Sequence, residues 1–197
     1  MKVTSAVFNT SSLDLAGCPE PVYPEFALIG RSNVGKSSLL NMITGKKGLA
    51  MVSETPGKTK LLNFFTINNK WRLVDLPGYG FAKVAKGEVN RFNESVVEYL
   101  THRGDNLICV LSLIDSRLPP QEIDLEFIDW MIDMGVPFVL VFTKTDKINA
   151  AKLEENLQVY KEALSEMCED LPEILTCSSK TGAGHKDLLK FVQSALP

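Results

Sequence analysis

Eight residues in the first quarter of the chain match a phosphate-binding pattern. The segment from Gly30 to Ser37 fits GxxxxGK[ST], in which backbone N–H groups of a glycine-rich turn surround phosphate oxygens. An apolar run precedes it and a helical segment follows, which favours a nucleotide site over an incidental turn. We expect Lys36 to neutralise the β- and γ-phosphates and Ser37 to bind Mg²⁺. The expected phosphate-site residues are Gly30, Arg31, Ser32, Asn33, Val34, Gly35, Lys36, Ser37 and Ser38.

A second candidate segment follows an apolar run at residues 71–74. It consists of Asp75, Leu76, Pro77 and Gly78. Alone, this D-x-P-G sequence could be a plain turn. After a phosphate-binding loop it predicts more: Asp75 can hold Mg²⁺, usually through water, and the Gly78 N–H can reach a γ-phosphate.

Two further segments could read the base of a nucleotide. Thr143, Lys144, Thr145 and Asp146 follow the apolar run at residues 137–142. A carboxylate at Asp146 could accept from N1–H and the N2 amino group of guanine, whereas adenine would leave it unpaired at a cost of a few kcal/mol. The alkyl stem of Lys144 can lie along the base. The segment Ser178, Ser179 and Lys180 is less specific and could contact guanine O6 through backbone N–H groups.

A loop that leads into the strand predicted at residues 61–67 could close over the metal. It contains Thr55, Gly57, Lys58, Thr59, Lys60 and Leu61. A threonine here could bind Mg²⁺ when a γ-phosphate is present, as switch loops do. Position alone does not choose between Thr55 and Thr59.

The elements that must position these segments alternate along the chain. Strands are predicted at residues 26–29, 61–67, 71–76, 107–114, 137–142 and 174–177, and helices at 36–43, 88–103, 121–134, 150–168 and 186–196. This predicts one α/β domain over residues 26–197, with a mixed, mostly parallel six-stranded sheet covered by helices on both faces. The Asn68-Asn69 turn would make residues 61–76 a hairpin that adds an antiparallel edge strand. Residues 1–25 are expected to be a lead-in in which Phe8 and Tyr23 pack on the domain.

Composition limits the class of protein. The chain has 197 residues, of which 45% are hydrophobic and 23% charged, as in ordinary globular domains. We find neither a membrane-span-length apolar run nor a signal peptide, so a cytoplasmic monomer is expected. The four cysteines form no CxxC pair, which argues against zinc.

Charge is unevenly distributed, although the net charge is only −3. The segment from Arg31 to Arg91 contains eleven basic residues and only three acidic ones. This predicts a basic face on an otherwise acidic molecule, although some of these lysines could simply be solvated.

The motifs, taken in this order, resemble the translation-factor-related class of GTPases, and in particular the EngB (YihA/YsxC) family of bacterial GTPases. The resemblance rests on residues 30–37, Thr55-Pro-Gly-Lys-Thr-Lys-Leu-Leu-Asn-Phe-Phe65, Asp75-Leu-Pro-Gly-Tyr-Gly-Phe-Ala-Lys-Val84 and Ile114-Asp-Ser-Arg117. It covers nearly the whole chain. Thr143, where many GTPases have Asn, fits the same family.

The resemblance implies GTP binding and hydrolysis to GDP, with Ser37 and Thr59 as direct Mg²⁺ ligands. It also implies a role in assembling the large ribosomal subunit, and a requirement for normal cell division and septation that could be indirect. Basic residues beside the switch loops, such as Lys83 and Lys86, could then bind ribosomal RNA phosphates.

Tyr79 stands where many GTPases carry a water-positioning Gln. We therefore expect slow intrinsic hydrolysis that needs a stimulus. Asn33 resembles an Asn that recruits K⁺ in related GTPases, and K⁺ could supply the missing positive charge. The alternative for Asn33 is a residue that stabilises the turn. The sequence also allows two other functions. One is a P-loop ATPase or kinase, and the other is a GTP-dependent binding module with negligible hydrolysis.

Overall fold

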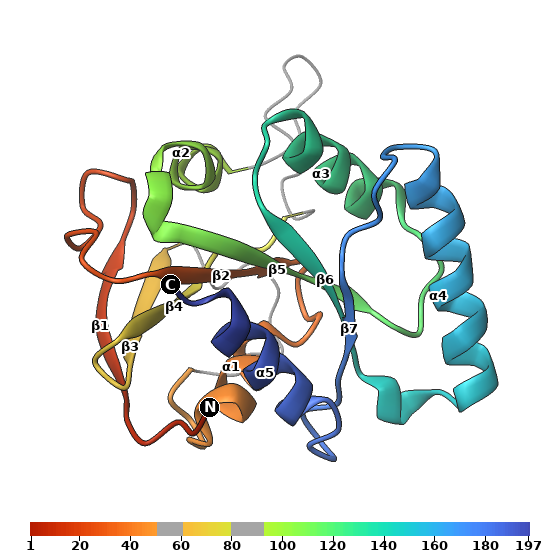
Figure 1. Cartoon of the computed structure of the whole chain (residues 1–197), viewed down its shortest axis with the longest axis horizontal. Coiled ribbons are helices and arrows are strands. Elements are labelled where there is room, and N and C mark those ends of the chain that lie inside the picture. The colour runs from red at the N-terminus through yellow and green to blue at the C-terminus, as the bar shows by residue number, and fades with distance from the viewer. Residues whose placement is uncertain (51–60, 80–92) are drawn as a thin grey trace.

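The computed structural model of the chain describes residues 1–50, 61–79 and 93–197. Within these residues one sheet is covered by helices on both faces, which confirms the expected α/β fold class (Figure 1). The strands are β1 (Ala6–Ser12), β2 (Glu25–Gly30), β3 (Leu62–Ile67), β4 (Trp71–Asp75), β5 (Leu107–Asp115), β6 (Phe138–Thr143) and β7 (Ile174–Thr176). The helices are α1 (Lys36–Thr44), α2 (Glu94–His102), α3 (Glu122–Asp133), α4 (Ala150–Ser165) and α5 (His185–Ala195), with short 3-10 turns at Gly104–Asn106 and Thr145–Lys147.

The sheet of the described residues has seven strands rather than the six expected, in the order β1-β3-β4-β2-β5-β6-β7. Strands β4, β2, β5, β6 and β7 run parallel, and β3 is antiparallel to both β4 and β1. The missed strand is β1, which takes the edge position expected for the hairpin. Its Val7 and Phe8 are about half exposed, so no buried apolar pattern revealed it.

The hairpin turn between β3 and β4 forms as predicted. Asn68 and Asn69 adopt φ of 53° and 51°, a left-handed backbone typical of tight hairpin turns, and the Lys70 N–H donates to the Ile67 carbonyl at 3.0 Å. The Asn68 side chain then accepts hydrogen bonds from the backbone N–H and hydroxyl of Thr4, at 2.7 and 2.9 Å. Phe8 packs edge-on against Phe65, with 5.5 Å between ring centroids, so the residues before β2 are tied to the domain.

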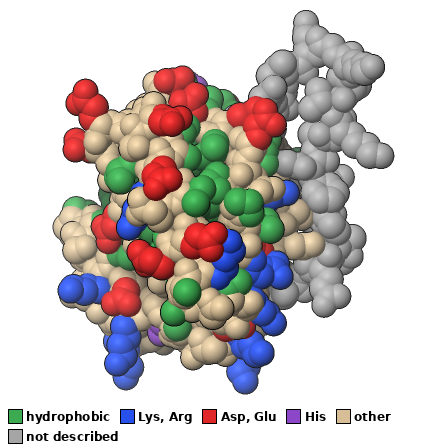
Figure 2. All heavy atoms as spheres, turned by 90° about the vertical axis from the view of Figure 1, so that its right-hand side faces the viewer, with side chains coloured by type: hydrophobic (Ala, Val, Ile, Leu, Met, Phe, Trp, Pro, Cys, Tyr) green, Lys and Arg blue, Asp and Glu red, His purple; other side chains and the backbone are tan. Residues whose placement is uncertain are grey.

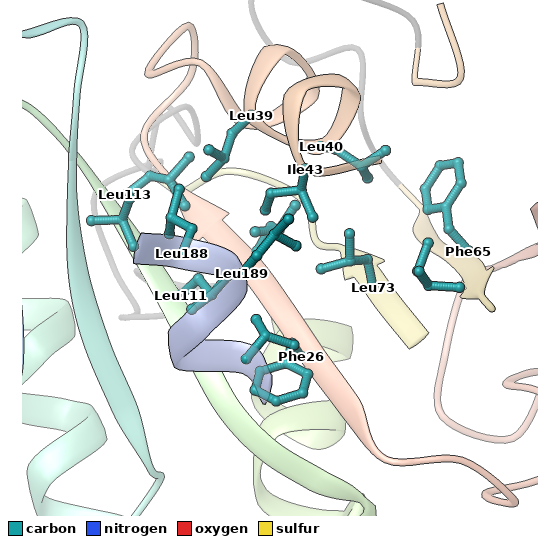
Figure 3. Packing of buried hydrophobic residues seen from close by; sticks show 14 of the residues in the cluster. Phe26, Leu39, Leu40, Ile43, Phe65, Leu73, Leu111, Leu113, Leu188 and Leu189 are labelled. Atoms are coloured by element: carbon teal, nitrogen blue, oxygen red, sulfur yellow. The ribbon is translucent and has the colours of Figure 1, made fainter. Parts of the chain in front are cut away.

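Two apolar layers lie on opposite faces of the sheet. Helices α1 and α5 cover one face, where Leu40 and Ile43 meet Leu189 above Leu73 and Phe26 (Figure 3). Helices α2, α3 and α4 cover the other face (Figure 1). Fully buried leucines of this kind each contribute about 2 kcal/mol through burial, so both layers hold the strand ends in fixed positions.

A buried ionic cluster lies where β2 begins. Glu25 is fully buried and accepts from Arg103 at 2.7 and 2.8 Å, from Arg72 at 3.0 Å and from the Tyr99 hydroxyl at 2.8 Å. Because both carboxylate oxygens are paired, the charge is compensated. Tyr23 lies beneath Arg72, with 5.2 Å from Cζ to the ring centroid. The cluster fixes the end of β2 that is far from its glycine-rich loop.

Candidate functional site

The glycine-rich loop joins β2 to α1, as the sequence predicts. Gly35 is the residue before α1 and has φ of 114°, a backbone that side chains rarely adopt. No side chain of the described residues caps α1, whereas Asn93 caps α2 and Asn149 caps α4. The first N–H groups of α1 therefore keep their capacity to bind an anion such as phosphate.

Gly78 lies directly against this loop. A Cβ added to it would be 2.8 Å from the Gly30 carbonyl oxygen, 3.0 Å from Lys36 Nζ and 3.4 Å from the Ser32 nitrogen. No side chain would fit there without displacing backbone. The close approach brings the Asp75–Gly78 segment and the phosphate-binding loop together, so that both can contact the same phosphates.

Asp75 ends β4 and is 4% exposed. Burial raises its pKa to about 6, and the nearby Lys36 charge only partly opposes this. Burial likewise lowers the pKa of Lys36, with Asp75 opposing. Asp75 Oδ1 accepts no hydrogen bond from the described residues. The buried carboxylate oxygen of Asp75 and the hydroxyl of Ser37, the second residue of α1, are oxygen ligands of the kind Mg²⁺ prefers, so the residues fit this metal. The Mg²⁺ would neutralise phosphate charge.

Thr143 ties the end of β6 to the phosphate loop. Its hydroxyl donates to the Val34 carbonyl at 2.7 Å, with the Ile114 carbonyl as a second acceptor at 3.1 Å. Thr143 is 3% exposed. The threonine that departs from the common Asn form thus has a defined structural function, because it links two loops and the neighbouring strand β5.

Lys144 continues this link. Its Nζ donates to the Asn33 carbonyl at 2.7 Å and to Asp115 Oδ2 at 2.8 Å. Arg117 also pairs with Asp115, at 2.8 and 2.7 Å. Burial raises the pKa of Asp115, but the hydrogen bonds from Arg117 and Lys144 outweigh it and lower the pKa to about 2. The Lys144 stem is therefore fixed between two loops, where it could support a planar base.

Asp146 is oriented by a residue from the loop after β7. The Ser178 hydroxyl donates to Asp146 Oδ1 at 2.7 Å and lowers the pKa of this carboxyl group. Asp146 Oδ2 accepts nothing from the described residues, so it could accept from a base. The Thr145 N–H donates to the Cys177 carbonyl at 3.3 Å, which joins the two loops.

The backbone of residues 178–180 differs in part from the expectation. The Ser178 N–H already donates to the Ala183 carbonyl at 3.1 Å, so it is not available to a base. Ser179 and Lys180 remain as exposed candidates for contact with guanine O6. The function of the Ser178 side chain in orienting Asp146 was not predicted from the sequence.

Tyr79 turns away from the phosphate loop. Its ring stacks on Phe127 of α3, with 4.6 Å between centroids, and its hydroxyl donates to Asp124 Oδ1 at 2.9 Å. The expectation that Tyr79 does not orient water stays a prediction. Sequence reasoning missed Asp115 and Asp124 as partners of site residues.

The expected switch loop cannot be placed. Thr55, Gly57, Lys58, Thr59 and Lys60 lie outside the described residues, as do Lys83, Lys86 and Arg91. Leu61 is described and directly precedes β3. No helix among the described residues is long and apolar enough to span a bilayer.

The loop after β2, the Asp75–Gly78 segment and the Thr143–Asp146 segment meet at the carboxyl ends of parallel strands, where ligands bind in such sheets. This fold and site define a P-loop GTPase. Residues 25–144 match the family model described as 50S ribosome-binding GTPase.

The chain belongs to the EngB family of GTP-binding proteins. It is 46% identical over 194 residues to the probable GTP-binding protein EngB of Bacteroides fragilis. This match covers 98% of this chain and 96% of the relative. The EngB of Porphyromonas gingivalis matches equally, with 46% identity over the same coverage. It is a GTPase, an enzyme that binds guanine nucleotide and hydrolyses GTP.

Solved structures agree in fold. The crystal structure of a probable GTP-binding protein engB has a TM-score of 0.68 at 24% identity, over 87% of this chain and 97% of that one. Era in complex with MgGDPNP and nucleotides 1506–1542 of 16S ribosomal RNA has a TM-score of 0.66 at 27% identity. That match covers 89% of this chain but only 57% of Era.

Proposed function

We propose that this GTPase is a cytoplasmic switch in assembly of the large ribosomal subunit, binding the subunit or its precursor while GTP is bound. The family description as a 50S ribosome-binding GTPase supports this proposal, as does the likeness to Era, which is solved with ribosomal RNA. The single observation that carries it is the joining of the phosphate and base loops through Thr143 and Val34 at 2.7 Å. One nucleotide can thereby set the geometry of several loops.

The site residues take the functions that their positions support. Residues 30–38 hold the phosphates, Ser37 and Thr59 bind Mg²⁺ directly, and Asp75 binds it through water. Gly78 contacts the γ-phosphate through its backbone N–H. Lys144, Asp146, Ser179 and Lys180 select guanine, and Ser178 contributes by orienting Asp146.

Nucleotide selection is tested by titrating the wild type and Asp146→Ala with GDP, GTP and ATP. The wild type should bind guanine nucleotides and exclude ATP. The variant should lose that preference, because the unpaired Asp146 Oδ2 is the acceptor for guanine. Comparable ATP binding by the wild type would support the ATPase alternative and overturn the guanine assignment.

The charges of the described residues bear on where the proposed ribosomal surface could lie. On the α4 side, acidic side chains are spread over the upper part of the face and Lys and Arg gather lower down (Figure 2). The exposed acidic residues of α4 include Glu154, Glu155 and Glu162. The acidic upper part of this face would repel RNA phosphates (Figure 2). Within the basic segment, Arg72 is buried on Glu25 and Lys36 is directed to the phosphate loop, whereas Lys46, Lys47 and Lys70 are exposed.

The ribosomal proposal is tested by co-sedimentation with large subunits, using GDP and a non-hydrolysable GTP analogue at several salt concentrations. Binding should require the analogue and weaken steeply with salt. The double variant Lys83→Glu/Lys86→Glu should weaken subunit binding and leave nucleotide affinity unchanged. Lys152→Glu/Lys161→Glu on α4 makes the same charge change and should bind like the wild type. Equal binding by all three proteins would contradict the proposed RNA surface.

Hydrolysis is proposed to be slow until a partner or K⁺ assists it, because the Tyr79 side chain faces α3. For Asn33, φ of 61° supports a turn function, and its exposed position beside the phosphate loop also allows a K⁺ function. Single-turnover GTP hydrolysis rates in K⁺ and Na⁺, with and without ribosomal subunits, distinguish the turn function of Asn33 from the K⁺ function. Equal rates in all four conditions would exclude stimulation by K⁺ and by the subunit, and would favour a binding module with negligible turnover.

A further inference from the structure

The residue after the proposed γ-phosphate sensor is anchored to a different element. Tyr79 is 5% exposed, and its ring stacks on Phe127 at 4.6 Å with an interplanar angle of 28°. Its hydroxyl donates to Asp124 Oδ1 at 2.9 Å. Asp124 and Phe127 are both buried in the first half of α3.

This anchor is stronger than an ordinary buried contact. Asp124 is 3% exposed, and burial raises its pKa to about 6, so at neutral pH most of it is a carboxylate. Hydrogen bonds to buried carboxylates are about twice as strong as neutral ones. Breaking this bond would leave a charged oxygen without that donor in a desolvated position.

Gly78, the residue before Tyr79, has no room to move toward the phosphate loop. Its Cα lies so close to Gly30 and Lys36 that a Cβ would be 2.8 and 3.0 Å from them. A separate link joins the phosphate loop to the start of α3, since Arg31 Nη1 lies 3.4 Å from Oε1 of Gln121, the residue before this helix. The Gly78 N–H is thus set between a fixed loop and a fixed helix.

We propose that Asp124 and Phe127 are positioning residues that act through Tyr79 to fix the Gly78 N–H for the γ-phosphate, so that α3 sets the preference for GTP over GDP. The inference rests on the proposed function of Gly78. Asp124 acts through the tyrosine; the charge of Arg31 in the phosphate loop also lowers its pKa, so Tyr79→Phe is the sharper test of the anchor. GDP lacks the γ-phosphate, so its affinity should not depend on the anchor.

The chain offers a matched control for this anchor. Tyr99 is also fully buried and donates to a buried carboxylate, Glu25 Oε2, at 2.8 Å. It belongs to the cluster at the opposite end of β2 from the phosphate loop. Tyr79→Phe and Tyr99→Phe therefore remove the same kind of hydrogen bond, one beside Gly78 and one far from it.

The experiment measures Kd for Mg²⁺–GDP and for a Mg²⁺-bound non-hydrolysable GTP analogue, together with urea unfolding. In Tyr79→Phe the affinity for the analogue should fall about tenfold while GDP affinity changes less than about twofold. Tyr99→Phe should lose comparable stability and keep the wild-type affinity ratio. Asp124→Ala should match Tyr79→Phe, and the double variant should add little. Asp124→Asn keeps an acceptor and should restore most of the preference.

Three outcomes would overturn the inference, and the third is distinguishable from the first two. If the wild type binds both nucleotides but Tyr79→Phe and Asp124→Ala keep its affinity ratio, α3 has no part in γ-phosphate sensing. The same follows if Tyr99→Phe shifts the ratio equally. If the wild type binds neither guanine nucleotide, the proposed function fails and the inference fails with it.

Discussion

The Thr143 hydroxyl lies 2.7 Å from the carbonyl oxygen of Val34, although 109 residues separate the two along the chain. The bond is buried and joins the strand end that leads to the base-reading segment with the loop that surrounds the phosphates. A threonine has one hydroxyl and uses it inside the protein, so its effect on nucleotide should be indirect.

Thr143→Val should reveal this indirect effect. The substitution keeps the shape and removes the hydroxyl, leaving the buried Val34 carbonyl without this donor at a cost of about 1–2 kcal/mol of unfolding free energy. GDP and GTP affinities should fall by the same factor, and ATP should remain excluded. Titration with the three nucleotides and urea unfolding check this.

The control for this substitution is Thr44→Val. Thr44 is also buried and donates to the Leu40 carbonyl at 2.8 Å, but within α1. It should change stability and leave nucleotide affinity unaffected. A selective loss of GTP binding in Thr143→Val would show that the hydroxyl acts on the γ-phosphate instead.

Ser178→Ala should weaken guanine binding through Asp146. Without the 2.7 Å hydrogen bond, the carboxylate loses its orientation and its pKa rises toward the ordinary value. We expect GDP affinity to fall roughly tenfold, as for the loss of one charged hydrogen bond. Ser194→Ala on α5, which removes an exposed hydroxyl bonded to the Phe191 carbonyl, is the control. Unchanged GDP affinity would show that Ser178 does not orient the base acceptor.

Asp115 should make stability depend on pH. Its folded pKa of about 2 lies below the ordinary 3.8, so the folded state favours the ionised form. This contribution is fully present above about pH 4 and is lost as the pH falls toward 2. Asp115→Asn should therefore be less stable than the wild type by roughly 2 kcal/mol at pH 7. The gap should narrow as the pH falls below 4.

Urea unfolding from pH 7 to pH 3 measures this gap. Asp133→Asn at the exposed end of α3 serves as the comparison and should follow the wild type throughout. A gap for Asp115→Asn that stays constant with pH would indicate lost packing and not lost charge pairing.

Glu25→Gln should be among the most destabilising single changes. The neutral amide leaves Arg72 and Arg103 buried without their counter-charge, which costs about 3–5 kcal/mol. The cluster is far from the phosphate loop, so the fraction of Glu25→Gln protein that remains folded should keep its preference for guanine nucleotides. Chemical unfolding and GDP titration test the two parts separately. A loss of under 1 kcal/mol would show that water or a rearranged partner replaces the charge.

The motif residues were predictable because their chemistry is local. The spacing from Gly30 to Ser37, the segment after β4 and the segment after β6 each follow an apolar run, and parallel strands bring such ends together. Asn68 and Asn69 predicted the hairpin turn for the same local reason. These features need only short-range pattern and the rule for ligands at strand ends.

The rest depends on contacts that no local pattern encodes. Strand β1 is half exposed and polar. Its position at the sheet edge therefore follows only from its antiparallel pairing with β3, which a local pattern does not encode. Ser178 meets Asp146 across 32 residues, and Tyr79 meets Asp124 across 45. A serine or aspartate on a predicted loop or helix is ordinarily solvated, so such partners could not be chosen from the sequence.

The cluster around Glu25 also bears on how this chain can diverge. One carboxylate binds the guanidinium group of Arg72 on β4 and, from the end of α2, the Tyr99 hydroxyl and the Arg103 guanidinium group. Replacing Glu25 alone leaves two buried guanidinium groups without their counter-charge, whereas exchanging all four residues for a packed apolar set need not leave a buried charge unpaired. Lineages descended from this sequence should therefore keep the four residues together or lose them together, and intermediates should be rare.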